Sequence, residues 1–224
     1  MMQIHNPATG ARATRNLESD AGSASPLRTG VTTVERARTL DDLEAQFNAA
    51  RERAQALVDS AGAELCSTPP AAGSWSAAEC IQHLNISADA YLPIWQQIIA
   101  NAGPRKKEIS SPYRTDFWGR LFPWILEPPA RIRSKTPVPF EPVVCEGIGS
   151  VLGGFVERQE RIVAAVRRCR GRAIDHVKMG SPVDRRIRYS IWSSFLIVAA
   201  HQRRHLWQAE QAVRSLRSVK QPSA

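Results

Sequence analysis

The sequence has few of the features that mark disulfide-rich, redox-active or membrane-spanning proteins. Only four of its 224 residues are cysteines, and no two of them form a C-x-x-C pair. This spacing argues against a zinc ribbon, a thioredoxin-type redox pair and a dense disulfide framework, and it favours buried free thiols. The longest apolar run, Ile191 to Ala200, is far shorter than the roughly 18 residues that a membrane span needs. We therefore expect a soluble protein with no membrane segment.

Composition and the ends of the chain predict one folded domain with two tails. Hydrophobic residues make up 43% and charged residues 23%, which is ordinary globular usage and excludes wholesale disorder. Residues 1–33 mix small and polar side chains without a helical or strand period, so we expect a flexible N-terminal tail. They also lack the pattern of a secretory signal, which predicts a cytoplasmic protein. We place the folded domain at residues 34–217 and a C-terminal tail at 218–224.

Apolar side chains recur at steps of three and four in four segments, the period of amphipathic helices. The predicted helices span residues 40–61, 77–98, 148–169 and 184–217. Residue pairs three apart predict the first two helix starts, Thr39 with Asp42 and Ser76 with Glu79. No strand pattern competes with these helices, so the predicted fold class is all-α.

A long proline-rich crossover separates the second and third predicted helices. Residues 104–142 hold eight of the chain's fifteen prolines and cannot form one regular helix. We expect a packed crossover with one short helix around residues 117–121, since connections of this length are usually functional. Such a connection lets the flanking helices run parallel, whereas short connections make neighbours antiparallel. The prediction is a four-helix bundle with up-down-down-up topology.

Three histidines form the sharpest candidate site. His201 and His205 are four residues apart on the apolar face of the helix predicted at residues 184–217. This spacing places their Cβ atoms roughly 6 Å apart. His83 lies at the border of the apolar face of the second helix. Three imidazoles with one open position are a known arrangement for a reactive divalent ion. Ser194 and Gln208, which flank the pair on the seam, are polar where a plain bundle would be apolar.

The same pattern has a plainer interpretation without a metal. Hydrogen bonds could satisfy the histidines, and the candidate partners are Ser87, Gln159, Ser194 and Gln208. Glu79 lies one turn before His83 and could act as a base, although its capping role explains it fully. Gln202 replaces the glutamate of an H-E-x-x-H motif, which argues against a metalloprotease. His5 and His176 are interpreted as incidental.

The basic charge of the chain is concentrated near its end. The formal net charge is +9, and residues 151–224 alone hold 15 Lys plus Arg against 5 Asp plus Glu. We interpret this excess as a solvated outer face on which Arg203 and Arg204 point outward, with attraction of an anionic partner as the alternative. No zinc-finger, RNP-like or compact helix-turn-helix pattern is present, which argues against sequence-specific nucleic acid binding.

The histidines and the start of the second helix resemble a known family. Trp75-Ser76 with Glu79 and His83-Leu84, followed by His201-x-x-x-His205-Leu206 and Gln208, are similar to the DinB/YfiT-like superfamily of metalloenzymes. The resemblance covers roughly residues 35–217. It implies a DinB-like four-helix bundle, often a homodimer, with a divalent metal held at His83, His201 and His205.

The resemblance also implies a range of activities. Characterised relatives include S-transferases and isomerases that use bacterial low-molecular-weight thiols, and proposed metal-dependent hydrolases. We therefore expect a metal-dependent enzyme that acts on a small-molecule substrate, similar to a thiol-dependent S-transferase. A hydrolase, and a non-catalytic bundle with a structural metal or a partner-binding role, remain alternatives. Three imidazoles accept Zn, Ni, Fe or Mn, so the pattern does not select the ion. The N-terminal tail and the crossover are not part of the family's common pattern. The substrates of the characterised relatives therefore cannot be assigned to this chain.

Overall fold

The computed structural model describes residues 37–106, 112–129, 135–143 and 147–220, and helices dominate them. The elements in chain order are α1 (Leu40–Ser67), α2 (Ala77–Ile99), α3 (Phe117–Leu126), the 3-10 turn η1 (Val138–Phe140), α4 (Ile148–Arg168), β1 (Lys178–Gly180), β2 (Arg188–Ser190) and α5 (Ile191–Lys220). The predicted tail at residues 1–33 lies outside the described residues, as do residues 221–224. The all-α fold class is confirmed.

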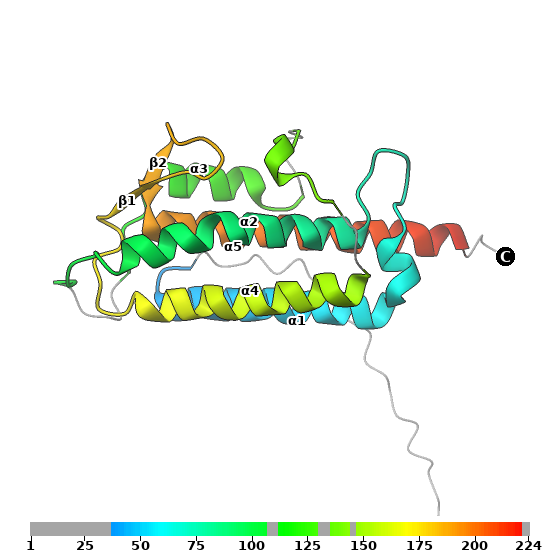
Figure 1. Cartoon of the computed structure of the whole chain (residues 1–224), viewed down its shortest axis with the longest axis horizontal. Helices are drawn as coiled ribbons and strands as arrows, with labels where there is room; N and C mark the ends of the chain where they lie inside the picture. Colours follow the sequence, from blue (N-terminus) through cyan, green and yellow to red (C-terminus); the bar gives the residue numbers. More distant parts are fainter. Residues whose placement is uncertain (1–36, 107–111, 130–134, 144–146, 221–224) are drawn as a thin grey trace, which may run out of the picture. The chain divides into compact units, whose positions relative to one another are not determined.

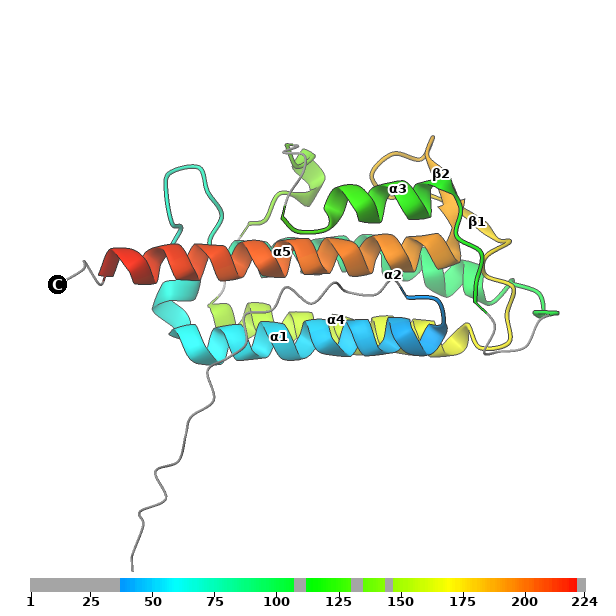
Figure 2. The ribbon, with the colours of Figure 1, turned by 180° about the vertical axis from the view of Figure 1, so that it is seen from behind.

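Four long helices form the predicted bundle. α1 and α2 each pack against both α4 and α5. α1 and α5 run in one direction, and α2 and α4 run in the opposite one (Figures 1 and 2). The topology is therefore up-down-down-up, with the parallel pair α2 and α4 joined by the long crossover. Within that crossover, α3 lies along α5.

Capping boxes start α1 and α2 at the predicted residues. The Thr39 hydroxyl accepts the Asp42 amide at 3.2 Å, and the Asp42 carboxylate accepts the Thr39 amide at 2.9 Å. In α2 the corresponding bonds join Ser76 and Glu79 at 3.1 and 2.7 Å. Each pair satisfies two backbone amides that a helix start leaves free. The carboxylate of Glu79 is thus engaged as a cap.

The start of the last helix was predicted wrongly. α5 begins at Ile191 rather than at residue 184, and β1 and β2 precede it as a small antiparallel sheet with Met179 opposite Tyr189. The expectation of no strand was wrong as well. Each strand has three residues, too few to produce a readable alternation. The buried Tyr189 hydroxyl hydrogen-bonds that of Tyr91 at 2.7 Å, which ties β2 to α2.

The short helix of the crossover is longer than expected. The prediction stopped it at residue 121, ahead of Pro123, but α3 continues to Leu126 with Pro123 inside it. Asp116 caps its start by accepting the Gly119 amide at 2.9 Å. A Cβ atom at Gly119 would lie 2.2 Å from Ser193 Oγ, so α3 approaches α5 as closely as glycine allows.

The apolar core of the bundle consists of two clusters. One contains Trp95, Trp192 and Phe195 and reaches along α5 as far as Ala199. The other begins on α5 at Leu206 and contains residues of α1, α2 and α4. His201 and His205 lie on α5 between these clusters, so the candidate site interrupts the apolar packing. Among the described helices, none has both the length and the apolarity that crossing a bilayer requires.

Candidate metal centre

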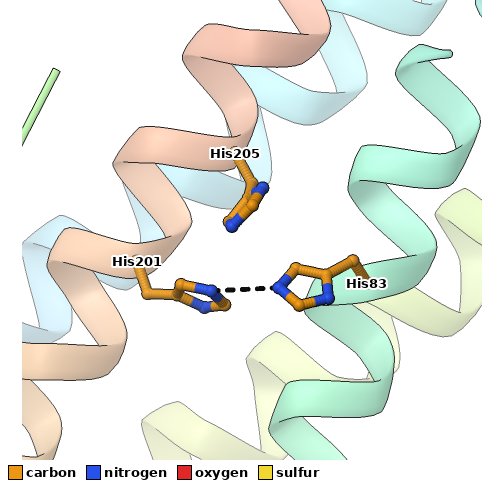
Figure 3. Close-up of side chains that lie close together, drawn as sticks. All are labelled: His83, His201 and His205. Atoms are coloured by element: carbon orange, nitrogen blue, oxygen red, sulfur yellow. Dashed lines mark hydrogen bonds between the residues drawn. The ribbon is translucent and has the colours of Figure 1, made fainter. Parts of the chain in front are cut away.

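The structure brings together the three histidines that the sequence pattern selected. His83 projects from α2, and His201 and His205 project from successive turns of α5 (Figure 3). One ring nitrogen of each lies within 4.8 Å of the other two. His83 Nε2 and His201 Nε2 are 3.0 Å apart, and the ring centroids are separated by 4.4 to 4.9 Å. Within the described part of the chain, this is the group of His, Cys, Asp or Glu side chains whose geometry could hold an ion.

A backbone carbonyl of the crossover orients His83. The Phe140 oxygen lies 2.7 Å from His83 Nδ1, and a carbonyl can only accept, so Nδ1 carries the proton. His83 Nε2 is then the unprotonated nitrogen, and it is the atom that faces His201. The carbonyl thus selects the tautomer that aims a lone pair at the cluster, as the outer partners of ligating histidines do.

One of the hydrogen-bonding partners proposed by the plainer interpretation is observed, because Gln208 hydrogen-bonds the His205 side chain, whereas Ser194 bonds other groups. Ser194 Oγ accepts from Trp95 Nε1 at 2.7 Å and donates to the Ile191 carbonyl at 2.6 Å. Both amide atoms of Gln159 are buried without a hydrogen bond, as are His205 Nδ1 and Gln208 Oε1. Buried polar atoms normally have partners, so these four atoms keep unused hydrogen-bonding capacity.

The electrostatic environment keeps the three imidazoles neutral. Burial lowers the pKa of His83, although the hydrogen bond to Phe140 raises it in part. Burial, then His83 and Arg204, lower the pKa of His201 to about 3. The pKa of His205 falls well below its usual value, again mainly through burial. Neutral rings carry the lone pairs that metal coordination needs.

An aromatic ring lies beside the histidine cluster. The Trp75 ring lies 5.1 Å from the His83 ring and 5.9 Å from the His205 ring, centroid to centroid. In the sequence, Trp75 belonged to the family-like motif at the start of the second helix, and no role at the site was assigned to it. Its ring now forms one wall of the site, which its position in sequence did not reveal.

The outward placement predicted for Arg203 and Arg204 is wrong. Arg204 is 7% exposed, and Arg203 Nη1 donates to Gln46 at 2.8 Å while its Nε donates to Glu127 at 3.1 Å. Helical periodicity treated the far side of α5 as solvent, but α3 covers it. Glu127 is the C-cap residue of α3, so this ion pair fastens the crossover beside the histidines. No side-chain pattern marked Glu127, or Phe140, whose carbonyl is a backbone group.

The other described histidine does not join the centre. His176 lies in a turn with its side chain 67% exposed, outside the cluster. His5 lies outside the described residues. Among the described histidines, the cluster therefore contains the three that the sequence pattern grouped.

Comparisons with known proteins give one match. No curated protein and no solved structure matches the chain. The family model of the DinB superfamily matches residues 46–209, which is well over half of the chain and includes all three histidines. The helical bundle described above agrees with this match. The chain belongs to the DinB superfamily.

Proposed function

We propose that the protein binds one divalent metal ion through His83, His201 and His205. The observation that carries the proposal is the convergence of three neutral ring nitrogens, from two helices, to within 4.8 Å of one another. A tetrahedral ion with metal to nitrogen bonds of about 2.0–2.1 Å holds its ligands about 3.4 Å apart. The 3.0 Å between His83 Nε2 and His201 Nε2 is close to that spacing, and three ring nitrogens would leave a fourth position for a ligand from outside the protein.

We further propose that the centre serves an enzyme similar to a thiol-dependent S-transferase acting on a small molecule. A divalent ion held there would stabilise the thiolate form of a coordinated thiol and so supply a nucleophile. The chain's own part is to orient His83 through the Phe140 carbonyl and to shield the cluster with the Trp75 ring. No carboxylate belongs to the described cluster, so a base for activating water is missing, which favours a thiol.

The cysteines that the structure describes are unsuited to supply the thiol, which favours a cosubstrate as its source. Cys66, Cys80 and Cys169 are buried. Burial raises the pKa of all three thiols, to about 12 for Cys80 and for Cys169. Such thiols are almost wholly protonated at pH 7 and are poor nucleophiles.

Metal analysis of the full chain tests the binding proposal. We expect about one equivalent of a divalent ion in the purified or reconstituted protein, and none in His83→Ala or His201→Ala. His176→Ala is the matched control, because this exposed histidine lies outside the cluster. Retention of the ion by both cluster variants, or failure of the wild type to bind zinc, nickel, iron or manganese, would overturn the proposal.

A thiol-conjugation assay tests the activity. Several low-molecular-weight thiols are offered with a chromogenic electrophile, and we expect turnover that chelation and His201→Ala abolish. Ester or amide hydrolysis without thiol conjugation would replace the transferase proposal with the hydrolase alternative. Unfolding on chelation, without either activity, would assign the ion a structural role.

A further inference from the structure

A second concave site lies apart from the histidines. It is a groove of about 360 Å³ between the start of α1, residues 112–115 ahead of α3, α3 itself and Leu196 of α5. Leu196 precedes His201 by five residues and His205 by nine. At 100° per residue these side chains lie about 140° and 180° away around the helix axis. The groove therefore opens on a different face of α5 from the metal centre.

Three arginines from separate segments line this groove. Arg38 precedes α1, Arg114 precedes α3, and Arg120 lies in α3, while none of the described residues that line the groove is acidic. Within the described part of the chain, the side chains of Arg114 and Arg120 form no ion pair. Three guanidinium groups around one hollow favour an anion.

Carboxylates close to these arginines in sequence are already engaged. Asp116 accepts Lys178 Nζ at 2.6 Å, the Ser190 amide at 2.7 Å and the Gly119 amide at 2.9 Å. The carboxylate of Asp42 accepts the backbone amides at the start of α1. Asp42 interacts electrostatically with Arg38, and neither carboxylate is among the described residues that line the groove.

The base of the groove is apolar and firmly supported. Tyr113 and Leu196 line it and are only 5% and 7% exposed. The Tyr113 ring stacks on the Trp192 ring at 4.7 Å between centroids, with 19° between the ring planes. Trp192 is in turn fixed by a hydrogen bond from its Nε1 to Thr115 Oγ1 at 3.1 Å. The Arg105 guanidinium also lies 3.7 Å from the centroid of the Tyr113 ring. Buried Tyr113 and Leu196 side chains beside a basic rim suit a ligand that has an apolar body and an anionic group.

We propose that this groove binds a small organic anion, namely a carboxylate or phosphate monoester with a flat apolar body. Guanidinium groups bind both anions through paired hydrogen bonds. The groove lies at the lower end of the roughly 300–1,000 Å³ range of small-molecule sites, so it has room for more than an inorganic ion. Its arginines are exposed, and the binding weakens as salt screens them. This inference is independent of the proposed metal chemistry.

Calorimetric titration of the full chain tests the proposal with four probes. Phenyl phosphate and benzoate carry an anionic group on an apolar ring, inorganic phosphate lacks the ring, and phenol lacks the charge. The protein is treated with chelator beforehand, so that coordination at the histidines cannot account for binding. We expect saturable one-to-one binding of phenyl phosphate or benzoate, at least tenfold tighter than that of inorganic phosphate, and none of phenol. The tighter of the two aromatic anions identifies the preferred acidic group.

Two matched double variants distinguish binding in the groove from general attraction of the anion by the basic surface of the protein. Arg114→Gln with Arg120→Gln should raise the dissociation constant at least tenfold. Arg168→Gln with Arg214→Gln removes the same charge from exposed positions outside the groove and should change it less than twofold. Equal losses in both variants, or no anion binding at 10 mM, would overturn the proposal. His83→Ala should retain binding, so failure of the metal proposal would leave this result unaffected.

Discussion

His83 Nδ1 lies 2.7 Å from the carbonyl oxygen of Phe140, so the crossover takes part in the candidate metal centre. The same crossover is fastened to α5 by the ion pair of Glu127 with Arg203. One contact reaches α2, which carries His83, and the other reaches α5, which carries His201 and His205. The orientation of the His83 ring, and with it the lone pair on Nε2, therefore depends on a segment outside the four bundle helices. If the crossover stabilises the binding-competent ring orientation, metal binding must stabilise the crossover by the same free energy.

Glu127→Gln should weaken both the fold and metal binding. The Arg203 side chain is only 15% exposed, and it would lose its charged partner beside the site. We expect a loss of about 1–2 kcal/mol in the free energy of unfolding, measured by urea denaturation. We also expect roughly tenfold weaker metal binding in a competition titration, the size typical of outer-shell changes.

Glu157→Gln is the control for that change. Glu157 is exposed and lies 3.9 Å from Arg161 on α4, so its loss should cost less than about 0.5 kcal/mol and leave metal affinity unchanged. Wild-type metal affinity in Glu127→Gln would show that the crossover does not support the centre.

Acid should destabilise the metal-free protein through its buried histidines. Their pKa values are lowered in the folded state, to about 3 for His201, whereas unfolded histidine titrates near 6.5. Below pH 6.5 the unfolded chain therefore binds more protons, and stability present above that pH is lost as pH falls. Each histidine contributes a slope approaching about 1.4 kcal/mol per pH unit below its unfolded pKa.

Urea denaturation of chelator-treated protein between pH 7.5 and pH 5 measures this slope. His201→Gln should have a shallower pH dependence than the wild type, because one of the buried titrating groups is gone. His176→Gln, changed in an exposed turn outside the cluster, is the control substitution. Parallel curves for all three proteins would show that His201 accepts protons in the folded state.

The bundle could be predicted because its signals are local and repetitive. The seam that includes Leu43, Phe47 and Ala50 gives the helical period directly, and those side chains are buried in α1. Capping pairs such as Ser76 with Glu79 are three residues apart and can be recognised without tertiary information. The β1–β2 hairpin was missed because its strands are too short to alternate and its partner Tyr91 is distant in sequence.

The candidate site was predictable in its side chains but not in its surroundings. His201 and His205 share a helix face by spacing alone, and the bundle topology allows His83 to meet them. Phe140 could not be found, because its contribution is a backbone carbonyl positioned by a proline-rich turn. Arg204 was misplaced because helix periodicity does not indicate that a crossover covers the outer side of α5.

The buried thiols should resist modification in the folded protein. Burial raises the pKa of Cys80 and of Cys169 to about 12, and it raises that of Cys66 as well. At pH 8 we expect less than about a tenth of each of these cysteines to react with a maleimide within an hour, and full reaction in urea. Peptide mapping by mass spectrometry assigns the label to each residue. Rapid native labelling of Cys80, three residues before His83, would undermine the argument for an external thiol.

Gly119→Ala should push α3 away from α5. The new Cβ atom would lie 2.2 Å from Ser193 Oγ and 2.5 Å from Ser193 Cβ, both on a fully buried residue of α5. Overpacking of this kind costs about 1–3 kcal/mol, which exceeds the helix-propensity gain of roughly 1 kcal/mol from replacing glycine. The matched control is Gly153→Ala in α4, where a Cβ atom meets nothing within 4 Å, so that variant should be as stable as the wild type or more so. Urea denaturation compares the two variants. If Gly119→Ala were as stable as Gly153→Ala, the close approach of α3 to Ser193 would not hold the crossover in place.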